Sequence, residues 1–475
     1  MDLRDDAPLL DAWLTFAGAV ARGTVHPFAI PGHKQRTDLV GDVIRGDIPL
    51  YAACAPVKGA DALLARAEAE AARAWGVDWA RFSVGGSTHG NQALALAVAA
   101  PGDDVIVSRT LHRSLLLGLV LAGLRPVWVR PDVDAATGLP ACVPVAYVEH
   151  ALAEHSGARA VFLGDPSYVG TTSDVSAHAR AAHAAGIPLI VDAAWAAHFG
   201  FSTALPPHAL ALGADAIVTS AHKVLPAASQ AALVLARTNH SGGLLDPDRL
   251  GRAFDASHTT SPSGTILASI DAARAVLVRD GEQLGRRLVD LVATARRRLS
   301  AVPGLRVIDG PGVEPAKLVI LLADTGAHGH DVEADLWDCG LPLEMADRDL
   351  LVPIVTIADD EISVGTLVDA VVASVERHRS APREPTGWAA WSVDPVTATD
   401  PRTAFFAPHV AVPADEAVGR VCAELVAPYP PGIPVLAPGE VVTGQALAAL
   451  RAVRDDGGRI AYAADPTLAT IQVLA

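Results

Sequence analysis

The sequence holds few of the features that direct a protein to a membrane, to secretion or to a metal. Its four cysteines, Cys54, Cys142, Cys339 and Cys422, are far apart and form no Cys-x-x-Cys pair. This spacing argues against a zinc site or a disulfide framework and predicts reduced thiols. No run of about 18 uncharged apolar residues occurs, and the first residues lack the pattern of a signal peptide. We therefore expect a cytoplasmic protein that does not cross a membrane.

Positive charge is also scarce. Lysine and arginine number 37 against 53 aspartates and glutamates, which leaves a net charge of −16. Such a balance argues against nucleic acid and anionic membranes as partners. No long low-complexity tract occurs, and 51% of the 475 residues are hydrophobic, enough for two or three domains with sizeable cores.

Between about residues 60 and 240, short apolar segments alternate with alanine-rich segments of helical period. The expected strands are 104–109, 126–130, 160–164, 188–192, 216–219 and 232–236, and helices are expected at 91–99, 114–122, 148–154 and 177–185. Strands that are apolar on both faces and separated by helices predict an α/β fold with a mostly parallel sheet covered on both sides. In such a sheet, ligands bind beyond the carboxyl ends of the strands.

The pattern changes after residue 260. Long helices are expected at 265–280 and 282–299, followed by strands at 318–322 and 350–355, as in a smaller α+β domain. Residues 380–402 are polar and contain several prolines, which is typical of a connector. The expected division is an N-terminal segment 1–60, a large domain 61–270, a small domain 271–380, a linker 381–401 and a C-terminal module 402–475.

Lys223 and Asp192 are the most informative residues. Lys223 follows the strand expected at 216–219, and Asp192 ends the strand expected at 188–192, so both lie at the ligand-binding edge. A lysine just beyond a buried strand is better explained as an amine held in a pocket, able to form a Schiff base, than as a solvated charge. A carboxylate at the same edge can pair with a pyridinium nitrogen. Together they predict an enzyme that uses pyridoxal 5′-phosphate (PLP).

Small and hydroxyl-bearing residues precede the helix expected at 91–99. Ser87, Thr88 and His89 follow two glycines there. Free N–H groups and the helix dipole favour a phosphate at such a helix start. An ordinary N-cap is the alternative, but it needs only one serine or threonine. Two histidines near strand ends leave alternatives open: His112 either is structural or stacks on a planar cofactor, and His198 is either catalytic or structural.

Motifs along nearly the whole chain resemble one family. They are His26-Pro-Phe-Ala-Ile-Pro-Gly-His-Lys34, Gly86-Ser-Thr-His-Gly-Asn-Gln92, Asp165-Pro-Ser-Tyr-Val-Gly170, Ser220-Ala-His-Lys-Val-Leu-Pro226, His258-Thr-Thr-Ser-Pro-Ser263, Ala404-Phe-Phe-Ala-Pro408 and Pro428-Tyr-Pro-Pro-Gly-Ile-Pro-Val435 with Pro438-Gly-Glu440. The sequence resembles the PLP-dependent ornithine/lysine/arginine decarboxylases of fold type I, the aspartate-aminotransferase-like class. The tail motif is the most discriminating because general fold-type-I aminotransferases lack it. We expect the compact form of the family, without an N-terminal wing domain.

The resemblance implies a role for each candidate residue. Lys223 would bind the cofactor aldehyde, Asp192 would hold the pyridine nitrogen, and His112 would stack on the ring. The phosphate would be surrounded by Ser87, Thr88, His89, Ser220 and His222, and Trp195 is expected at the cofactor. Glu344 resembles a glutamate that recognises the distal cationic group of the substrate; the alternative is a solvated loop carboxylate. The segment 259–263 is expected to reach the neighbouring subunit's site in a homodimer or higher oligomer.

The predicted reaction is decarboxylation of arginine, lysine or ornithine to the corresponding amine and CO2. The chain departs from compact relatives at Ala193 and Trp195, where they commonly have glutamate and histidine, and at His89, where a small residue is usual. Because of these departures, the resemblance does not predict which of the three amino acids is the substrate. Two alternatives stay open: another PLP reaction (transamination or decarboxylation coupled to oxidation), and a non-catalytic binding protein that keeps the fold.

Overall fold

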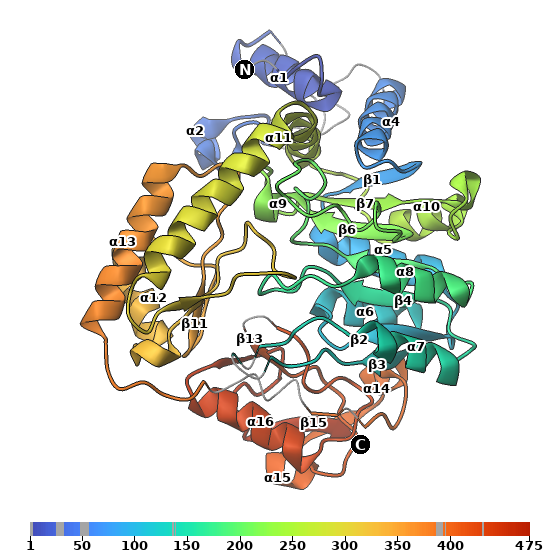
Figure 1. Cartoon of the computed structure of the whole chain (residues 1–475). Helices are drawn as coiled ribbons and strands as arrows, with labels where there is room; N and C mark the ends of the chain where they lie inside the picture. Colours follow the sequence, from blue (N-terminus) through green and yellow to red (C-terminus); the bar gives the residue numbers. More distant parts are fainter. Residues whose placement is uncertain are drawn as a thin grey trace.

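A seven-stranded sheet lies at the centre of the computed structural model (Figure 1). Its order is β1-β7-β6-β5-β4-β2-β3; β6, β5, β4, β2 and β3 are mutually parallel, and β7 is antiparallel to both β6 and β1. The strands are β1 (Trp79–Ser83), β2 (Asp104–Ser108), β3 (Arg125–Val129), β4 (Val161–Gly164), β5 (Leu189–Asp192), β6 (Ala216–Ser220) and β7 (Ala232–Ala236). The mostly parallel sheet predicted from the sequence is thus confirmed.

Helices cover both faces of this sheet. On one face α5 (Gly86–Val98), α6 (Arg113–Ala122) and α10 (Pro247–Asp255) share a core with Ile190 and Val218. On the other face α4 (Val57–Ala74), α7 (Val145–Glu154), α8 (Val175–Ala184) and α11 (Gly264–Ser300) share a core with Leu189 and Val191. Alternate residues of each strand are buried on opposite faces, which is why these strands are apolar throughout.

The structure describes residues 3–24, 33–47, 57–134, 137, 139–385, 393–394, 396–429 and 432–475. Cys54, most of the motif at residues 26–34, part of the connector and Pro430 and Pro431 of the tail motif lie outside these ranges. Within them no helix is both long and apolar enough to span a membrane. The N-terminal part contains α1 (Pro8–Ala21), α2 (Thr37–Val40) and a short 3-10 helix, Asp42–Ile44.

The two helices expected at 265–280 and 282–299 form one helix of 37 residues, α11, so that prediction was wrong. Gly281 lies between the two expected helices, and glycine inside a helix suggests a break. In the structure Gly281 is instead a packing residue within one continuous helix. A Cβ added at Gly281 would lie 2.9 Å from Cβ of Phe201, and one at Gly285 would lie 2.4 Å from Cβ of Ser202. These glycines allow close packing of α11 against the segment that follows β5.

The small domain combines the second half of α11 with a four-stranded antiparallel sheet of order β10-β11-β9-β8. Its further elements are β8 (Arg306–Val307), β9 (Ile320–Leu321), α12 (Gly329–Asp338), β10 (Met345–Ala346), β11 (Leu350–Val352) and α13 (Glu361–Arg377). The strands predicted at 318–322 and 350–355 are shorter than expected. β11 ends before Pro353, which has no N–H to donate to the ladder.

Other boundaries also differ from the prediction. Helix α5 begins at Gly86, five residues before the expected start. Strand β1 was not predicted, because Arg81 interrupts its apolar side chains; this arginine forms an ion pair with Glu68 of α4. Short 3-10 helices lie at Asn239–Ser241 and Ala323–Thr325.

The C-terminal module has its own core and lies beside α6 in Figure 1. Its elements are α14 (Pro401–Phe406), β12 (His409–Pro413), α15 (Ala414–Ala417), β13 (Ala427–Tyr429), α16 (Gly444–Asp455), β14 (Arg459–Ala461) and β15 (Thr470–Leu474). A buried ion pair joins the module to the large domain: Arg109 Nη1 lies 2.5 Å from Glu440 Oε1, and both side chains are almost inaccessible to solvent.

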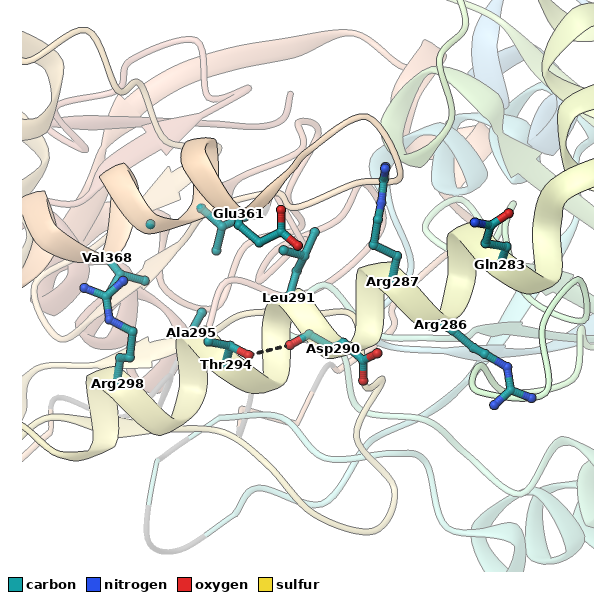
Figure 2. Close-up of a pocket in the computed structure, with 12 residues that line it drawn as sticks. Gln283, Arg286, Arg287, Asp290, Leu291, Thr294, Ala295, Arg298, Glu361 and Val368 are labelled. Atoms are coloured by element: carbon teal, nitrogen blue, oxygen red, sulfur yellow. Dashed lines mark hydrogen bonds between the residues drawn. The ribbon is translucent and has the colours of Figure 1, made fainter. Parts of the chain in front are cut away.

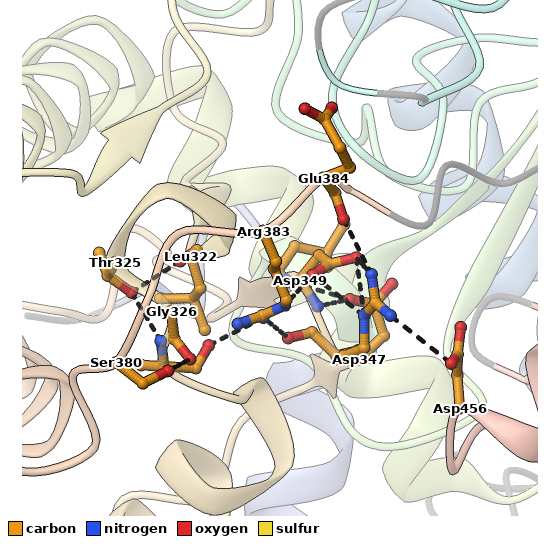
Figure 3. Close-up of polar contacts among 12 residues, drawn as sticks. Leu322, Thr325, Gly326, Asp347, Asp349, Ser380, Arg383, Glu384 and Asp456 are labelled. Atoms are coloured by element: carbon orange, nitrogen blue, oxygen red, sulfur yellow. Dashed lines mark hydrogen bonds and ion pairs between the residues drawn. The ribbon is translucent and has the colours of Figure 1, made fainter.

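A polar network fixes the chain that leaves α13 (Figure 3). The Arg383 guanidinium pairs with Asp349 at 2.9 Å and donates to the carbonyl oxygens of Ala327 and Arg348. Arg348 in turn forms an ion pair with Asp456 at the end of α16, at 3.5 Å. The small domain and the C-terminal module therefore contact each other through charged side chains.

Candidate active site

A cavity of about 550 Å³ opens at the carboxyl ends of β4, β5 and β6. Among the residues that line it are nine of the ten predicted site residues: Ser87, Thr88, His112, Asp192, Trp195, Ser220, His222, Lys223 and Glu344. They come from both the large and the small domain, and the C-terminal module adds Tyr429 and Ile433. Asp192 and Lys223, which the sequence placed at the same edge of the sheet, both line this cavity, and His89 does not.

Lys223 lies in α9 (Ala221–Val224), a single helical turn directly after β6. Its Nζ is 4.2 Å from the ring centroid of Trp195. Burial lowers the pKa of the Lys223 amine, and the carboxylates of Asp192 and Glu344 oppose this shift. A partly desolvated amine on an aromatic face is more readily deprotonated, and so more nucleophilic, than a solvated one.

Asp192 is held by an amide that the sequence gave no reason to single out. Asn91 of α5 donates from Nδ2 to Asp192 Oδ2 at 2.7 Å and to Ser114 Oγ at 2.9 Å. The N–H of Ala194 donates to the other carboxylate oxygen at 3.2 Å. Asn91 is fully buried, so these contacts fix the direction in which the carboxylate faces the cavity. Because the helix was expected to begin at residue 91, the sequence did not show that Asn91 lies more than one turn inside α5 and contacts Asp192.

His112 caps the N-terminus of α6. Its Nδ1 accepts the N–H of Ser114 at 3.2 Å and lies 2.8 Å from Ser114 Oγ. Because Nδ1 is an acceptor, the hydrogen of the neutral ring belongs on Nε2. Burial lowers the pKa of His112, and Lys223 acts in the same direction while Asp192 opposes it. A neutral ring at a fixed angle suits stacking on a flat ligand.

Hydroxyl groups and a helix N-terminus meet at one end of the cavity. Ser87 Oγ and Ser220 Oγ are 2.6 Å apart, which joins the start of α5 to the end of β6. Gly86 adopts a φ of +68°, and its N–H donates to the carbonyl of Gln230. The N–H groups of Ser87 and Thr88 lie in the first helical turn, where no carbonyl one turn earlier can accept them. This end of the cavity therefore favours an anion.

His89 does not belong to this group. Its side chain is buried on the other side of α5, with Nδ1 2.9 Å from Ser83 Oγ and Nε2 2.9 Å from the carbonyl of Phe254. The sequence placed Ser87, Thr88 and His89 in one loop. The structure instead has them in the first turn of a helix, where successive side chains point in different directions. His89 is thus a core residue, and the prediction of a side-chain contact with the cofactor is corrected.

Glu344 and three apolar or aromatic side chains form a further part of the cavity wall. Tyr168 donates its hydroxyl to Glu344 Oε1 at 3.0 Å, and its ring meets Trp195 edge-on at a centroid distance of 5.3 Å. Tyr429 and Ile433 complete this wall. The Pro-Tyr-Pro-Pro-Gly motif identified the tail, but the sequence indicated only a turn there. Glu344 is exposed, yet it faces the cavity.

His198, which the sequence left open, lies outside the cavity. It is buried with Nε2 3.2 Å from Glu314 Oε1. No group of three or more histidine, cysteine, aspartate or glutamate side chains among the described residues is arranged to hold a metal ion. A second cavity of about 380 Å³ lies between α11 and α13 (Figure 2), and its arginines include Arg286, Arg287 and Arg298. These arginines already bind Glu282, the carbonyl of Ile357 and Asp369 respectively.

The donor set of the first cavity fits PLP. The cofactor has an aldehyde, a pyridine nitrogen and a phosphate, and the cavity offers one matching group for each: the Lys223 amine, the Asp192 carboxylate and the hydroxyls at the start of α5. The backbone fits as well, because Gly86 has the left-handed conformation that glycine adopts without strain.

The fold is that of fold type I of the PLP-dependent enzymes. The lysine decarboxylase LdcF of Francisella novicida superposes with a TM-score of 0.80 over 99% of this chain and 81% of that one, at 19% identity. Serine palmitoyltransferase solved with PLP superposes with a TM-score of 0.54 over 66% of this chain and 77% of that one, at 16% identity. The superposition on serine palmitoyltransferase leaves about a third of the present chain unmatched.

Sequence comparison gives the family. Residues 52–346 match the Orn/Lys/Arg decarboxylase major domain, and residues 390–457 match the Orn/Lys/Arg decarboxylase C-terminal domain. The arginine decarboxylase of Halalkalibacterium halodurans is 30% identical over 97% of both chains, and that of Bacillus subtilis is 31% identical over 94% of both. The chain belongs to the Orn/Lys/Arg decarboxylase family and is an amino acid decarboxylase.

Proposed function

We propose that this enzyme binds PLP on Lys223 and decarboxylates a basic L-amino acid, with arginine as the preferred substrate. One observation carries the proposal: a single cavity is lined by an amine, a carboxylate and a helix start suited to an anion, and also by the Glu344–Tyr168 pair. The first three groups suit the cofactor, and the pair suits a cation on the substrate side chain. The choice of arginine is supported by the names of the two bacterial relatives.

Each group has a part in this chemistry. When bound, PLP supplies a ring that accepts the electron pair left by CO2. Asp192, oriented by Asn91, keeps a hydrogen on the ring nitrogen, which favours that acceptance. His112 limits the movement of the ring, and Lys223 or His112 delivers a proton to the carbon that has lost CO2.

Glu344 sets the position of the substrate side chain. A guanidinium forms two parallel hydrogen bonds with a carboxylate, a geometry that a lysine ammonium does not reproduce. The Tyr168 hydroxyl holds one oxygen of Glu344, which limits the directions from which a cation can approach. Tyr429 and Ile433 shield this pair with apolar surface.

The test is CO2 release from arginine, lysine and ornithine by the wild type and by Lys223→Ala and Glu344→Gln. We expect Lys223→Ala to lose at least about 10³-fold in kcat. Glu344→Gln should lower kcat/KM for arginine by about 10- to 100-fold, mainly through KM, because a charged hydrogen bond is lost. Glu416→Gln, an exposed glutamate in α15, is the matched control and should leave both constants unchanged.

Three results would contradict the proposal. Unchanged turnover in Lys223→Ala would contradict the whole proposed mechanism. Unchanged arginine selectivity in Glu344→Gln would contradict only the proposal that Glu344 binds the substrate side chain. Formation of a keto acid or consumption of O2 in place of amine and CO2 would favour transamination or oxidation, which use the same lysine and aspartate.

We also propose that two copies of the chain form a dimer with shared active sites. Thr259, Thr260 and Ser261 are exposed in the single chain and follow α10 on the side of the sheet where α5 begins. Sedimentation of the holoenzyme should show a dimer or a larger assembly, and a monomer with full activity would contradict the idea.

A further inference from the structure

The antiparallel strand β7 brings a further segment to the edge of the sheet where the cavity lies. Because β7 runs against β1 and β6, its first residue lies beside their last residues: Ala232 pairs with Ser83 on one side and with Ser220 on the other. The residues just before β7 therefore reach the cavity, and Ser229 and Gln230 are among those that line it. The proposed function gives neither of them a part.

Gln230 is the third residue of a tight turn. The N–H of Ala231 donates to the carbonyl oxygen of Ala228 at 3.0 Å, which closes a four-residue β-turn over 228–231. Gln230 has a φ of +71°. A positive φ at this position alone of the two central residues is the mark of a type II turn, which usually has glycine or asparagine there. Glutamine is therefore an unusual residue at this position.

Glycine is the rule at such positions in this chain. Among the described residues, most of those with a positive φ are glycines, and the exceptions are Lys34, Gln35, Gln230, Tyr462 and Leu468. Of these exceptions, Gln230 alone is among the residues that line the cavity. A side chain on a backbone with positive φ is strained, and such strain is found most often at functional sites. The location of Gln230 thus points to a use for its side chain.

The backbone contacts of Gln230 do not require a side chain. Its carbonyl oxygen accepts the N–H of Gly86 at 2.9 Å, which joins the turn to the start of α5. A Cβ added at Gly86 would lie 4.0 Å from Cα of Gln230, so the two segments are in contact. A glycine at position 230 would keep this hydrogen bond and would adopt the same φ without strain. Something other than the backbone must therefore favour glutamine.

The side-chain amide is available to a ligand. Gln230 is exposed in the single chain, and its amide forms no hydrogen bond with another described residue. It lines the same cavity as Ser87 and Thr88, whose N–H groups lie in the first turn of α5 and favour an anion. An amide NH2 group offers two further donors and carries no charge, so it donates at every pH.

We propose that Gln230 is a further cofactor-binding residue, whose side-chain amide donates to the phosphate of PLP beside the start of α5. This inference rests on the proposed function, in which the cavity binds PLP. The strained backbone is then the cost of placing an amide at a position that would otherwise hold glycine. Two consequences follow: loss of the amide should weaken the binding of the phosphate group, and replacement by glycine should not destabilise the apoprotein.

The experiment compares the apoprotein of the wild type with Gln230→Gly and Gln230→Glu. Affinity is measured by absorbance for PLP and for pyridoxal, which is the same compound without the phosphate. Gln230→Gly should bind PLP about tenfold more weakly, as for the loss of one hydrogen bond to a charged group, and should bind pyridoxal as the wild type does. Gln230→Glu keeps the size of the side chain but should lose at least as much affinity for PLP, because its carboxylate repels the phosphate.

Thermal unfolding of the apoproteins gives a readout that does not depend on the cofactor. Gln230→Gly should melt at or above the temperature of the wild type, because glycine adopts the positive φ without strain. Gln92→Ala is the control for loss of an amide that does not line the cavity, and it should bind PLP as the wild type does.

Three results would overturn the inference. The first is an unchanged affinity of Gln230→Gly for PLP. The second is an equal loss of affinity for PLP and pyridoxal, which would point to the shape of the cavity rather than to the phosphate. The third is a melting temperature of Gln230→Gly below that of the wild type, which would show that contacts within the protein hold the glutamine side chain.

Inorganic phosphate separates this inference from the proposed function. At matched ionic strength, phosphate should raise the melting temperature of the wild-type apoprotein more than that of Gln230→Gly, because a ligand stabilises the folded state in proportion to its affinity. An equal rise in both would also overturn the inference. If the wild type fails to take up PLP, the proposed function fails, whereas the phosphate measurement still decides whether Gln230 binds an anion.

Discussion

At the scale of single residues, the site depends on side chains that support the reacting groups. Lys223 and Asp192 could be identified from the sequence because each follows or ends an apolar strand. Asn91 and Tyr168 stand in motifs that resemble the family, and Ser114 does not. The sequence assigned none of the three a role, since amides and hydroxyls occur at many positions. Their importance comes from what they contact: Asp192, His112 and Glu344.

Asn91 allows a test at this scale. Asn91→Ala removes a buried donor from the Asp192 carboxylate, so we expect the affinity of the apoprotein for PLP to fall by about tenfold, as for the loss of one hydrogen bond to a charged group. Absorbance titration of the apoprotein with PLP measures this. Gln92→Ala changes the neighbouring half-buried amide, which does not line the cavity, and should have no effect. Equal affinities for both variants would show that Asp192 needs no such support.

At the scale of elements, the position of α5 decides where the proposed anion site lies. The helix packs so closely on the sheet that a Cβ added at Gly90 would lie 2.4 Å from Cγ2 of Val218 in β6 and 2.9 Å from Cγ2 of Val234 in β7. Glycine at this position is required by packing rather than by backbone conformation. The same contact sets the height of Ser87 and Thr88 above the strand ends.

Gly90→Ala should therefore lower the free energy of unfolding by about 1–3 kcal/mol, the usual cost of overpacking a core. Gly251→Ala in α10 is the matched control, because nothing lies within 4 Å of its added Cβ. That variant should be neutral or more stable by about 0.5–1 kcal/mol, since alanine favours a helix over glycine. Urea unfolding compares the two. A Gly90→Ala protein as stable as Gly251→Ala would show that α5 can move away from the sheet at little cost.

At the scale of the whole molecule, three parts of the chain must meet for the cavity to exist. The C-terminal module contributes Tyr429 and Ile433, and its attachment depends on Arg109. This guanidinium pairs with Glu440, donates to the carbonyl of Val435 at 2.9 Å and stacks on Trp128 at 4.7 Å from the ring centroid.

Glu440→Ala leaves Arg109 buried without a counter-charge, so we expect a loss of about 3–5 kcal/mol in stability. KM for the substrate should also rise, because Tyr429 and Ile433 belong to the same module. Asp415→Asn breaks the solvent-exposed pair with Arg451 and should cost less than about 1 kcal/mol. Thermal unfolding and steady-state kinetics of the two variants decide the point. Equal stability of the two would mean that the module is held by its apolar contacts alone.

Much of the fold could be predicted because its signals are local. The parallel strands are apolar on both faces and the helices between them have a clear period, so both were located to within a few residues. Errors arose where tertiary contacts override a local signal. Gly281 resembles a helix break until Phe201 is seen against it, and β1 is hidden by Arg81, whose charge is paired with Glu68.

The sequence by itself predicted the proposed chemistry: a lysine, an aspartate and a helix start suited to an anion at the same edge of a parallel sheet, because strand ends that follow apolar runs gather there. Tertiary structure alone decided which groups support that chemistry. In the folded chain the side chain of His89 lies in the core, and Tyr429 lines the cavity. Lys317 lies against the ring of Trp195, which Lys223 also contacts. These contacts join residues far apart in the chain, and no local pattern encodes a contact between side chains that meet only when the domains pack.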